Sequence, residues 1–188
     1  MGIDFQKYYS LLGDEKITYK GGALPQQVLY GFTKMNMFQG CKEILDVGCG
    51  NRTWSMVLQE MNYEVWSSDI NGTYDYVIND DMHKSQFGNK SFDGIFCNGV
   101  FEHSLSPFIM LCEMNRILKV NGEIFINMPD AENKQMSMLP QHINLHTYDS
   151  AKNLFDKTNF EIKEFVKFHD HENGIHLIFL LKKKGDLE

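Results

Sequence analysis

The chain alternates short apolar runs with stretches in which apolar residues recur every three or four positions. The apolar runs predict five buried strands, over residues 42–48, 64–70, 74–80, 92–99 and 122–129. The helical periodicity predicts helices over 53–61, 107–118 and 147–159, with Thr147 or Asp149 near the start of the last one. Strands separated by helix-length segments indicate crossover units and a mostly parallel sheet.

Both ends of the chain add to this pattern. Segments 161–168 and 174–183 predict a closing hairpin around "HDHENG", which adds an antiparallel strand at the edge of the sheet. The first forty residues predict a helical cap, with helices over 4–12 and 25–35 joined by a glycine turn at Gly21-Gly22. The expected fold is α/β: a doubly wound, mostly parallel seven-stranded sheet with an antiparallel C-terminal edge strand.

Composition narrows the class of protein. A chain of 188 residues with 43% hydrophobic residues favours one domain with a substantial core. A formal net charge of −7 argues against a nucleic-acid partner, because binding to phosphates needs a basic face. No apolar run approaches the roughly 20 residues of a membrane span, and we see no signal peptide. Composition leaves the oligomeric state open.

The four cysteines indicate a reducing cellular compartment rather than a metal or disulfide site. Cys41, Cys49, Cys97 and Cys112 form no C-x-x-C pair, so neither a disulfide framework nor a zinc site is indicated. We therefore expect reduced thiols in a cytoplasmic protein.

The stretch "ILDVGCG", residues 44–50, reads as a strand that enters a glycine turn. A dinucleotide fingerprint would need a third glycine where Thr53 stands, and the pattern of a phosphate loop is absent. Asp46, two residues before Gly48, would repel a pyrophosphate but attract an ammonium group. S-adenosylmethionine (SAM) carries an ammonium and a sulfonium and no phosphate. The turn therefore favours SAM, and it disfavours an NAD-type oxidoreductase on a similar sheet.

Five motifs in order resemble those of class I SAM-dependent methyltransferases of the small standalone type. They are "ILDVGCG", "VWSSDI", two within "NDDMHKSQFGNKSFDGIFCNGVFEH", and "RILKVNGEIFINMP", and the resemblance covers about residues 40 to 182. It implies a Rossmann-like fold and one methyltransferase domain over residues 1–188. Within it we expect the helical cap at 1–40, a SAM-binding half at 41–130, and a lid and substrate-side half at 131–188.

The resemblance also implies a set of SAM-binding residues: Asp46, Gly48, Cys49, Gly50, Asp69, Ile70, Asp81, Met82 and Asn98. The two glycines would let the backbone approach the methionine part of SAM, and Asp46 would help to hold its amino group. Asp69 follows Gly48 by 21 residues, the spacing at which an acid reaches ribose hydroxyls. Ile70 would pack on the adenine.

Alternatives remain at three of these positions. Asp81 would accept from the adenine amino group, with the Met82 amide beside it, but Asp80 competes for that role. Asn98 would line the methionine side of the site, although a turn could also require it. Asp69 could cap a turn.

Arg52 departs from the family, which usually has a third glycine there. Because the first turn of a helix has negative φ, we expect an arginine to fit without strain. Its guanidinium would either reach the SAM carboxylate or point into solvent.

Two histidines are candidates for the general base that an alcohol or phenol acceptor needs: His142 and His103. His103 could instead tie its loop to the backbone, and His146 fits better as part of a helix cap. His169, His171 and His176 read as a polar hairpin turn rather than as metal ligands, so no metal site is expected.

The acceptor is expected to be a small molecule. "NGVF" at 98–101 is not the N-P-P-aromatic motif of enzymes that methylate amino groups on bases, and both the cap and the lid over 129–140 are short. A hydroxyl oxygen is our first hypothesis for the methylated atom. The alternative from another class is a non-catalytic SAM-binding subunit that regulates a partner.

Overall fold

The computed structural model describes residues 26–72, 74–170 and 174–187. In chain order the elements are α2 (Gln26–Lys34), β1 (Glu43–Val47), α3 (Thr53–Glu60), β2 (Glu64–Asp69), β3 (Ile78–Asn79), β4 (Phe92–Asn98), the 3-10 turn η1 (Phe101–His103), α4 (Pro107–Ile117), β5 (Leu118–Pro129), α5 (Lys134–Ser137), α6 (Tyr148–Lys157), β6 (Phe160–Asp170) and β7 (Gly174–Lys183). The helix expected over 4–12 and the glycine turn at 21–22 lie outside the described residues.

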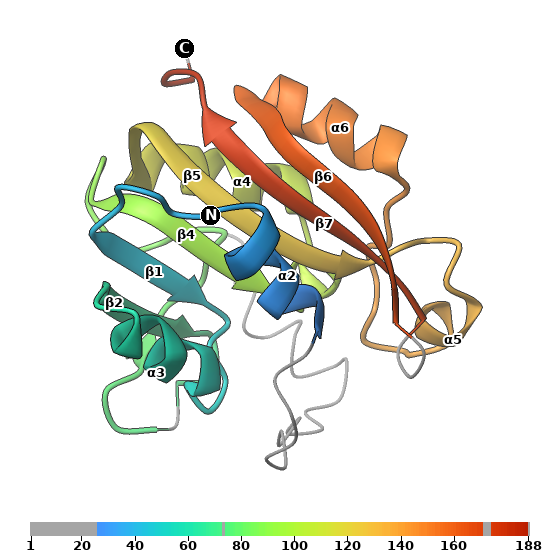
Figure 1. Ribbon diagram of the computed structural model, residues 1–188, viewed down its shortest axis with the longest axis horizontal. Coiled ribbons are helices and arrows are strands. Elements are labelled where there is room, and N and C mark those ends of the chain that lie inside the picture. The colour runs from blue at the N-terminus through green and yellow to red at the C-terminus, as the bar shows by residue number, and fades with distance from the viewer. Residues whose placement is uncertain (1–25, 73, 171–173, 188) are drawn as a thin grey trace, which may run out of the picture.

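Seven strands form one sheet in the order β3-β2-β1-β4-β5-β7-β6. The first five are mutually parallel, and β7 pairs antiparallel with both β5 and β6. This confirms the expected α/β fold, with the hairpin at the edge of the sheet (Figure 1). Within the hairpin β6 is the outermost strand, and the antiparallel β7 lies inside the sheet.

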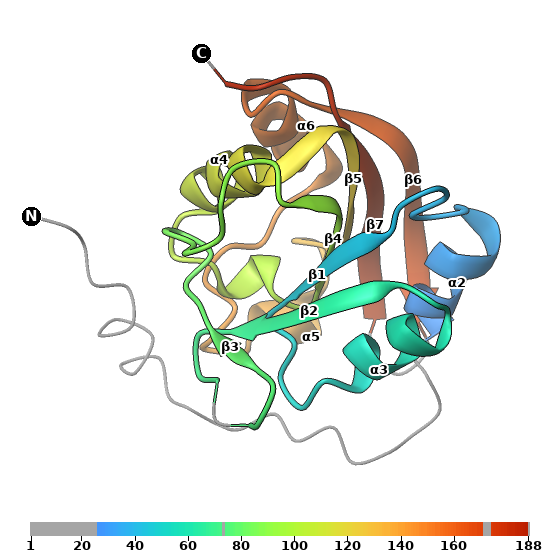
Figure 2. The same ribbon diagram turned by 90° about the vertical axis from the view of Figure 1, so that its left-hand side faces the viewer.

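Helices cover both faces of the sheet, as Figure 2 shows from the side. Alternate residues of β1 enter different cores: Ile44 packs in the cluster with residues of α2 and α3, whereas Leu45 and Val47 pack with α4 and α6. Both cores are rich in aromatic rings, including the stacked pair Phe96 and Phe125 at 5.2 Å. The sheet is therefore doubly wound. None of the described helices is both long and apolar enough to cross a membrane.

The third strand is much shorter than the run over 74–80 predicts. Only Ile78 and Asn79 pair with β2. Tyr76 has a φ of +69°, a left-handed conformation that a strand cannot contain, and its side chain is 86% exposed. The apolar run was thus misleading, because its tyrosines lie on the surface in a turn.

A buried lysine at the end of β7 bonds to the segment where α4 meets β5. Lys183, the last residue of β7, is fully buried. Its Nζ donates to the carbonyls of Asn115 (2.6 Å) and Leu118 (2.8 Å) and to Oδ1 of Asp186 (2.7 Å). Asn115 is in the last turn of α4, whose carbonyls have no partner within the helix. Lys183 therefore joins the hairpin to the end of α4 and the start of β5.

Candidate functional site

The strand order reverses between β1 and β4, the place where open parallel sheets bind ligands. Val47 pairs with Cys97, so Gly48 and Asn98 follow at the same level on neighbouring strands. Gly48 has a φ of +62°, and a Cβ added there would lie 2.4 Å from Cγ2 of Val100. Only glycine fits this turn, which brings its backbone close to the segment after β4.

Asp69 lies at the mouth of the same turn. Its Oδ2 accepts a hydrogen bond from the Gly50 amide (2.9 Å), and its Oδ1 accepts from the Asn71 amide (2.9 Å). The Cys49 amide donates to the Ser68 carbonyl at 3.0 Å, which fixes the turn against β2. Burial raises the pKa of the Cys49 thiol to about 12, so this cysteine is protonated at neutral pH. The structure therefore brings together the turn and the acid that the sequence selected.

Asp46 is a buried acid at the end of a row of hydrogen bonds. Arg52 Nε donates to Ser67 Oγ (3.1 Å), Ser67 Oγ donates to Ser55 Oγ (2.8 Å), and Ser55 Oγ donates to Asp46 Oδ2 (2.6 Å). Burial raises the pKa of Asp46 to about 7, although the Ser55 hydrogen bond opposes the shift. Asp46 is therefore only partly ionised at neutral pH, and a bound ammonium would favour its charged form.

This partial ionisation predicts a pH-dependent affinity for SAM. Between pH 5.5 and 7 the ionised fraction of Asp46 rises, while an α-amino group with a pKa near 7.7 stays charged. We expect the dissociation constant of SAM to fall by up to about tenfold over this interval. Calorimetric titrations at several pH values measure it, and Asp46→Asn should remove most of the dependence. An equally steep dependence in that variant would contradict the role given to Asp46.

The expectation for the backbone of Arg52 is wrong. Its φ is +67°, in the left-handed region, because Arg52 precedes the first turn of α3 rather than belonging to it. The Arg52 amide donates to the Cys49 carbonyl at 2.8 Å and closes the turn. Besides its bond to Ser67, the guanidinium lies 5.8 Å from the ring centroid of Tyr76. Arg52 thus keeps the conformation of the usual glycine, and its side chain packs on the protein.

Replacing Arg52 with glycine tests how much the turn needs this side chain. Glycine relieves the left-handed strain but loses the hydrogen bond to Ser67, two effects of about 1 kcal/mol each and of opposite sign. Because these two effects nearly cancel, we expect Arg52→Gly to bind SAM within about fivefold of the wild type by calorimetry. Complete loss of binding would show that the arginine itself is required.

The two acids after β3 have different surroundings. Asp80 is buried, and both of its oxygens accept hydrogen bonds at 2.8 Å, from Ser85 Oγ and the Gln86 amide. Asp81 is more exposed and accepts at Oδ1 from the His83 amide (2.9 Å) and His83 Nδ1 (2.7 Å). Burial alone would raise the pKa of Asp81, but the bonds from His83 lower it below its usual value. Asp80 is therefore committed to the local turn, and the adenine role of Asp81 stays a prediction.

His83 is a residue that sequence reasoning missed. Its Nε2 lies 2.9 Å from Ser104 Oγ, so one imidazole joins the segment after β3 to the segment after η1. Met82, next to it, is buried in the core, and Ile70 is half-buried directly after Asp69. No sequence motif indicated the bridge, because its two partners are far apart in the chain.

Asn98, the last residue of β4, is held by a second amide. Asn127 Nδ2 donates to Asn98 Oδ1 at 2.9 Å. Asn127 Oδ1 is buried and has no hydrogen-bond partner among the described residues. A buried amide oxygen without a donor is costly, so this pair favours a polar ligand at the carboxyl ends of the strands.

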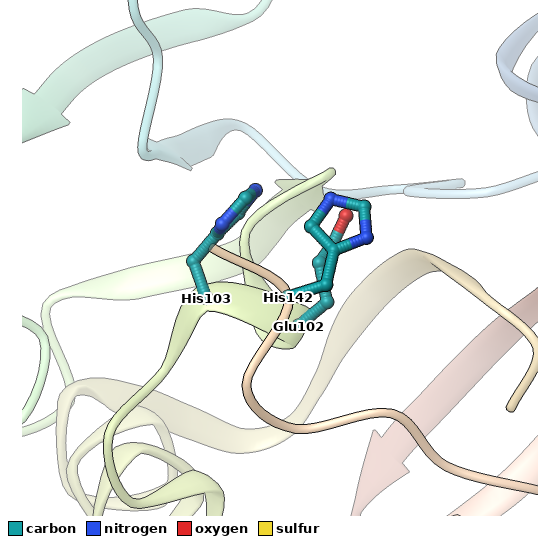
Figure 3. A group of neighbouring side chains, drawn as sticks. All are labelled: Glu102, His103 and His142. Atoms are coloured by element: carbon teal, nitrogen blue, oxygen red, sulfur yellow. The ribbon is translucent and has the colours of Figure 1, made fainter. Parts of the chain in front are cut away.

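Three side chains gather just beyond this point, from two separate segments (Figure 3). Glu102 and His103 belong to η1, and His142 lies on the loop after α5. One ligand atom from each residue lies within 4.8 Å of the others, and the two imidazole centroids are 4.9 Å apart. We call Glu102, His103 and His142 the histidine cluster. Sequence reasoning selected both histidines but missed Glu102, although it adjoins His103 in the chain.

The loop that carries His142 is fixed to η1 by its own backbone. The Asn144 amide donates to the Glu102 carbonyl at 3.1 Å, and the Asn144 side chain donates to the Ser104 carbonyl. His103 Nδ1 lies 3.1 Å from the Gln141 carbonyl. His103 therefore ties its loop to the backbone, which was the alternative to a role as general base. Its Nε2 keeps a free electron pair.

Burial sets the charge of the cluster. It raises the pKa of Glu102 to about 7. It also lowers the pKa of His103, with a further contribution from His142, and lowers the pKa of His142 against a backbone hydrogen bond at Met136. Both imidazoles are therefore neutral at pH 7, the state that a general base requires.

The remaining histidines lie elsewhere. His146 Nδ1 is 3.3 Å from Ser150 Oγ at the start of α6, whose N-cap is Thr147, as expected. His169 is exposed on β6 and His176 is buried on β7, while His171 lies outside the described residues. The two described members of this group thus lie on the paired strands of the hairpin, His169 opposite Ile175 and His176 opposite Phe168.

The turn and the histidine cluster adjoin each other through Val100, which packs on Gly48 and lies two residues before Glu102. The carboxyl ends of β1, β2 and β4 thus present a buried acid, Asp46, a second acid at the mouth of the turn, Asp69, and a backbone turn at Gly48 that excludes a Cβ. This donor set suits SAM, which needs an anionic contact and close backbone approach and brings no phosphate.

Comparison with known proteins is consistent with this geometry. A family model described as "Methyltransferase domain" matches residues 24–164. A tRNA U34 carboxymethyltransferase from Nautilia profundicola is 27% identical over 168 residues, which cover 78% of this chain. The chain spans about half, 52%, of the length of that curated relative.

Solved structures share the fold at low identity. A 1,6-didemethyltoxoflavin-N1-methyltransferase from Burkholderia thailandensis, with its substrate and S-adenosylhomocysteine bound, has a TM-score of 0.73 at 14% identity, covering 99% of this chain and 93% of its own. A SAM-dependent methyltransferase from Methanosarcina mazei has a TM-score of 0.67 at 15% identity, covering 81% and 97%.

Proposed function

Because this chain belongs to the SAM-dependent methyltransferases, with SAM as its cofactor, we propose that it methylates a hydroxyl oxygen of a small-molecule acceptor. The observation that carries the proposal is the histidine cluster, which lies next to the cofactor turn and holds two neutral imidazoles. A hydroxyl acceptor must lose its proton during transfer, whereas methyl transfer to a neutral amine can precede the loss of a proton.

We keep the SAM-binding residues that the family resemblance implies, and the geometry of the strand ends supports several of them. Asp46 would favour the ammonium group, Gly48, Cys49 and Gly50 would let the backbone approach the methionine part, and Asp69 would accept from the ribose hydroxyls. Asp69 already uses both oxygens on backbone amides, and each carboxylate oxygen can accept a second hydrogen bond. For the adenine we keep Ile70, Asp81 and Met82, and for the methionine side Asn98.

When bound, SAM supplies an electrophilic methyl group: an O–C bond forms, the C–S bond breaks, and the sulfonium becomes the thioether of S-adenosylhomocysteine. This chain must hold the acceptor oxygen in line and remove its proton. His142 and His103 are the candidates, since each has a nitrogen that can take up a proton. Glu102 stabilises the resulting imidazolium, because its pKa near 7 lets it become a carboxylate beside the new charge.

The lid supports a small acceptor. Residues 129–140 include α5, and their backbone contacts the segment after His142: Asp130 bridges to His146, and the Ala131 amide donates to the His146 carbonyl at 3.0 Å. The net charge of −7 also disfavours a polyanionic acceptor. The tRNA-modifying relative keeps a nucleic-acid acceptor as the second candidate. The four unpaired cysteines support a cytoplasmic location for the enzyme.

A panel of acceptors tests the proposal. Phenols, polyols, small hydroxy acids, primary amines and bulk tRNA are each incubated with the purified chain and methyl-labelled SAM, and formation of S-adenosylhomocysteine is measured by mass spectrometry. We expect product with at least one hydroxyl acceptor. Product with amines alone, or label in tRNA alone, would overturn the proposal, as would tight SAM binding with no product from any acceptor.

A further inference from the structure

The histidine cluster has the residue types of a metal site, and two of its ligand atoms are buried without a hydrogen-bond partner among the described residues. Glu102 is 5% exposed, and its Oε2 has no hydrogen-bond partner among the described residues. His142 Nδ1 is likewise a buried atom with no hydrogen-bond partner among the described residues. A carboxylate oxygen and an imidazole nitrogen, both buried and both lacking a donor, carry a cost that a bound cation would remove.

Each imidazole of the cluster has one nitrogen available to a ligand, and the backbone holds the ring of His103 on its other side. His103 Nδ1 must donate to the Gln141 carbonyl, 3.1 Å away, which leaves the lone pair on Nε2. His142 Nδ1 is also buried and has no hydrogen-bond partner among the described residues. Histidine ligands of metal ions have the arrangement of His103, in which a carbonyl fixes the tautomer and the ring orientation.

From this arrangement we infer that Glu102, His103 and His142 form a binding site for a divalent transition-metal ion. Two imidazoles and one carboxylate suit Zn²⁺ and similar ions, whereas Mg²⁺ and Ca²⁺ prefer oxygen ligands alone. Two ligands at about 2.1 Å from one ion lie roughly 3 to 4 Å apart. The three atoms already lie within 4.8 Å of one another, so side-chain shifts of about an ångström complete the set.

Such an ion would change how the proposed reaction loses its proton. This part of the inference rests on the proposed function. A hydroxyl group bound to a divalent ion becomes much more acidic. The two histidines would then act as ligands, and the acceptor hydroxyl, made acidic by the ion, would release its proton to solvent water before or during methyl transfer. This differs from the sequence expectation that the chain holds no metal.

Titration of the metal-free full chain with Co²⁺, and with Zn²⁺ in competition, tests the inference. We expect one ion per chain, with a visible Co²⁺ spectrum that lacks thiolate character and that Zn²⁺ abolishes. His103→Ala, His142→Ala and Glu102→Gln should each weaken binding by about tenfold or more. His169→Ala, at an exposed histidine outside the cluster, is the matched control and should bind as the wild type does.

The outcomes separate this inference from the proposed function. If the wild type binds no ion, or if ion binding survives the loss of both cluster histidines, the metal site is wrong, even when hydroxyl acceptors are methylated. If one ion binds at the cluster but no hydroxyl acceptor gives product, the metal site stands and the proposed function fails. Retained SAM affinity in each variant shows that it is folded.

Discussion

Replacing His142 with alanine is expected to lower the turnover number by about 10²- to 10⁴-fold, the usual contribution of a positioned acid or base. His142 is the member of the histidine cluster on the loop after α5, and its Nδ1 is buried without a partner among the described residues. The loss should appear whether the imidazole accepts the proton itself or ligates an ion that acidifies the acceptor. Formation of S-adenosylhomocysteine at saturating SAM and acceptor measures it.

The same variant should leave the cofactor site intact. His142 belongs to the histidine cluster and is not among the residues assigned to SAM, so the dissociation constant of SAM should change by less than about threefold, within the usual effect of a substitution that touches no ligand. His169→Ala, at an exposed position on β6, should keep full turnover. If His142→Ala turned over within about threefold of the wild type, the cluster would not be part of the chemistry.

Replacing Lys183 with methionine is expected to destabilise the fold by about 3–5 kcal/mol. Methionine fills a similar volume but donates no hydrogen bond, so the buried carbonyls of Asn115 and Leu118 lose their donor. Because domains have a stability of only about 5–15 kcal/mol, this is a large share of the total. Urea denaturation at equilibrium measures the change.

Lys184→Met is the matched control for that experiment. Lys184 follows Lys183 in the chain, but its side chain is exposed. The same chemical change there should alter the free energy of unfolding by less than about 0.5 kcal/mol. Equal destabilisation by both variants would show that the loss of charge, rather than the loss of buried hydrogen bonds, is responsible.

Most of the sheet could be predicted because its pattern is local. The apolar runs of β1, β2, β4 and β7 end within one residue of the observed strands. The run before Asp80 failed because tyrosines have strong strand propensity yet lie exposed in a turn here, where Tyr76 adopts a positive φ. Periodicity cannot tell a buried ring from an exposed one.

The only part of the candidate site that could be predicted is the part whose residues belong to one contiguous motif. The turn from Asp46 to Gly50 is contiguous, so its spacing indicated both its conformation and its ligand. Glu102 went unnoticed because its proximity to His142 depends on the loop after α5, which is some forty residues away in the chain and bonds to η1 through Asn144. The left-handed backbone of Arg52 was not predicted because the sequence does not locate the first residue of a helix to within one position. Arg52 is the residue before α3, and a residue inside the first turn would have a negative φ.

The place of β7 inside the sheet has a consequence for synthesis on the ribosome. Residues 174–183 separate β5 from β6, so β6 has no strand to pair with while only the preceding 173 residues have emerged. Until then the edge of β5 that pairs with β7 has no partner, a state prone to intermolecular strand pairing. The nascent chain must therefore wait for one late strand before its interior can close, and chaperone engagement is most valuable in that interval.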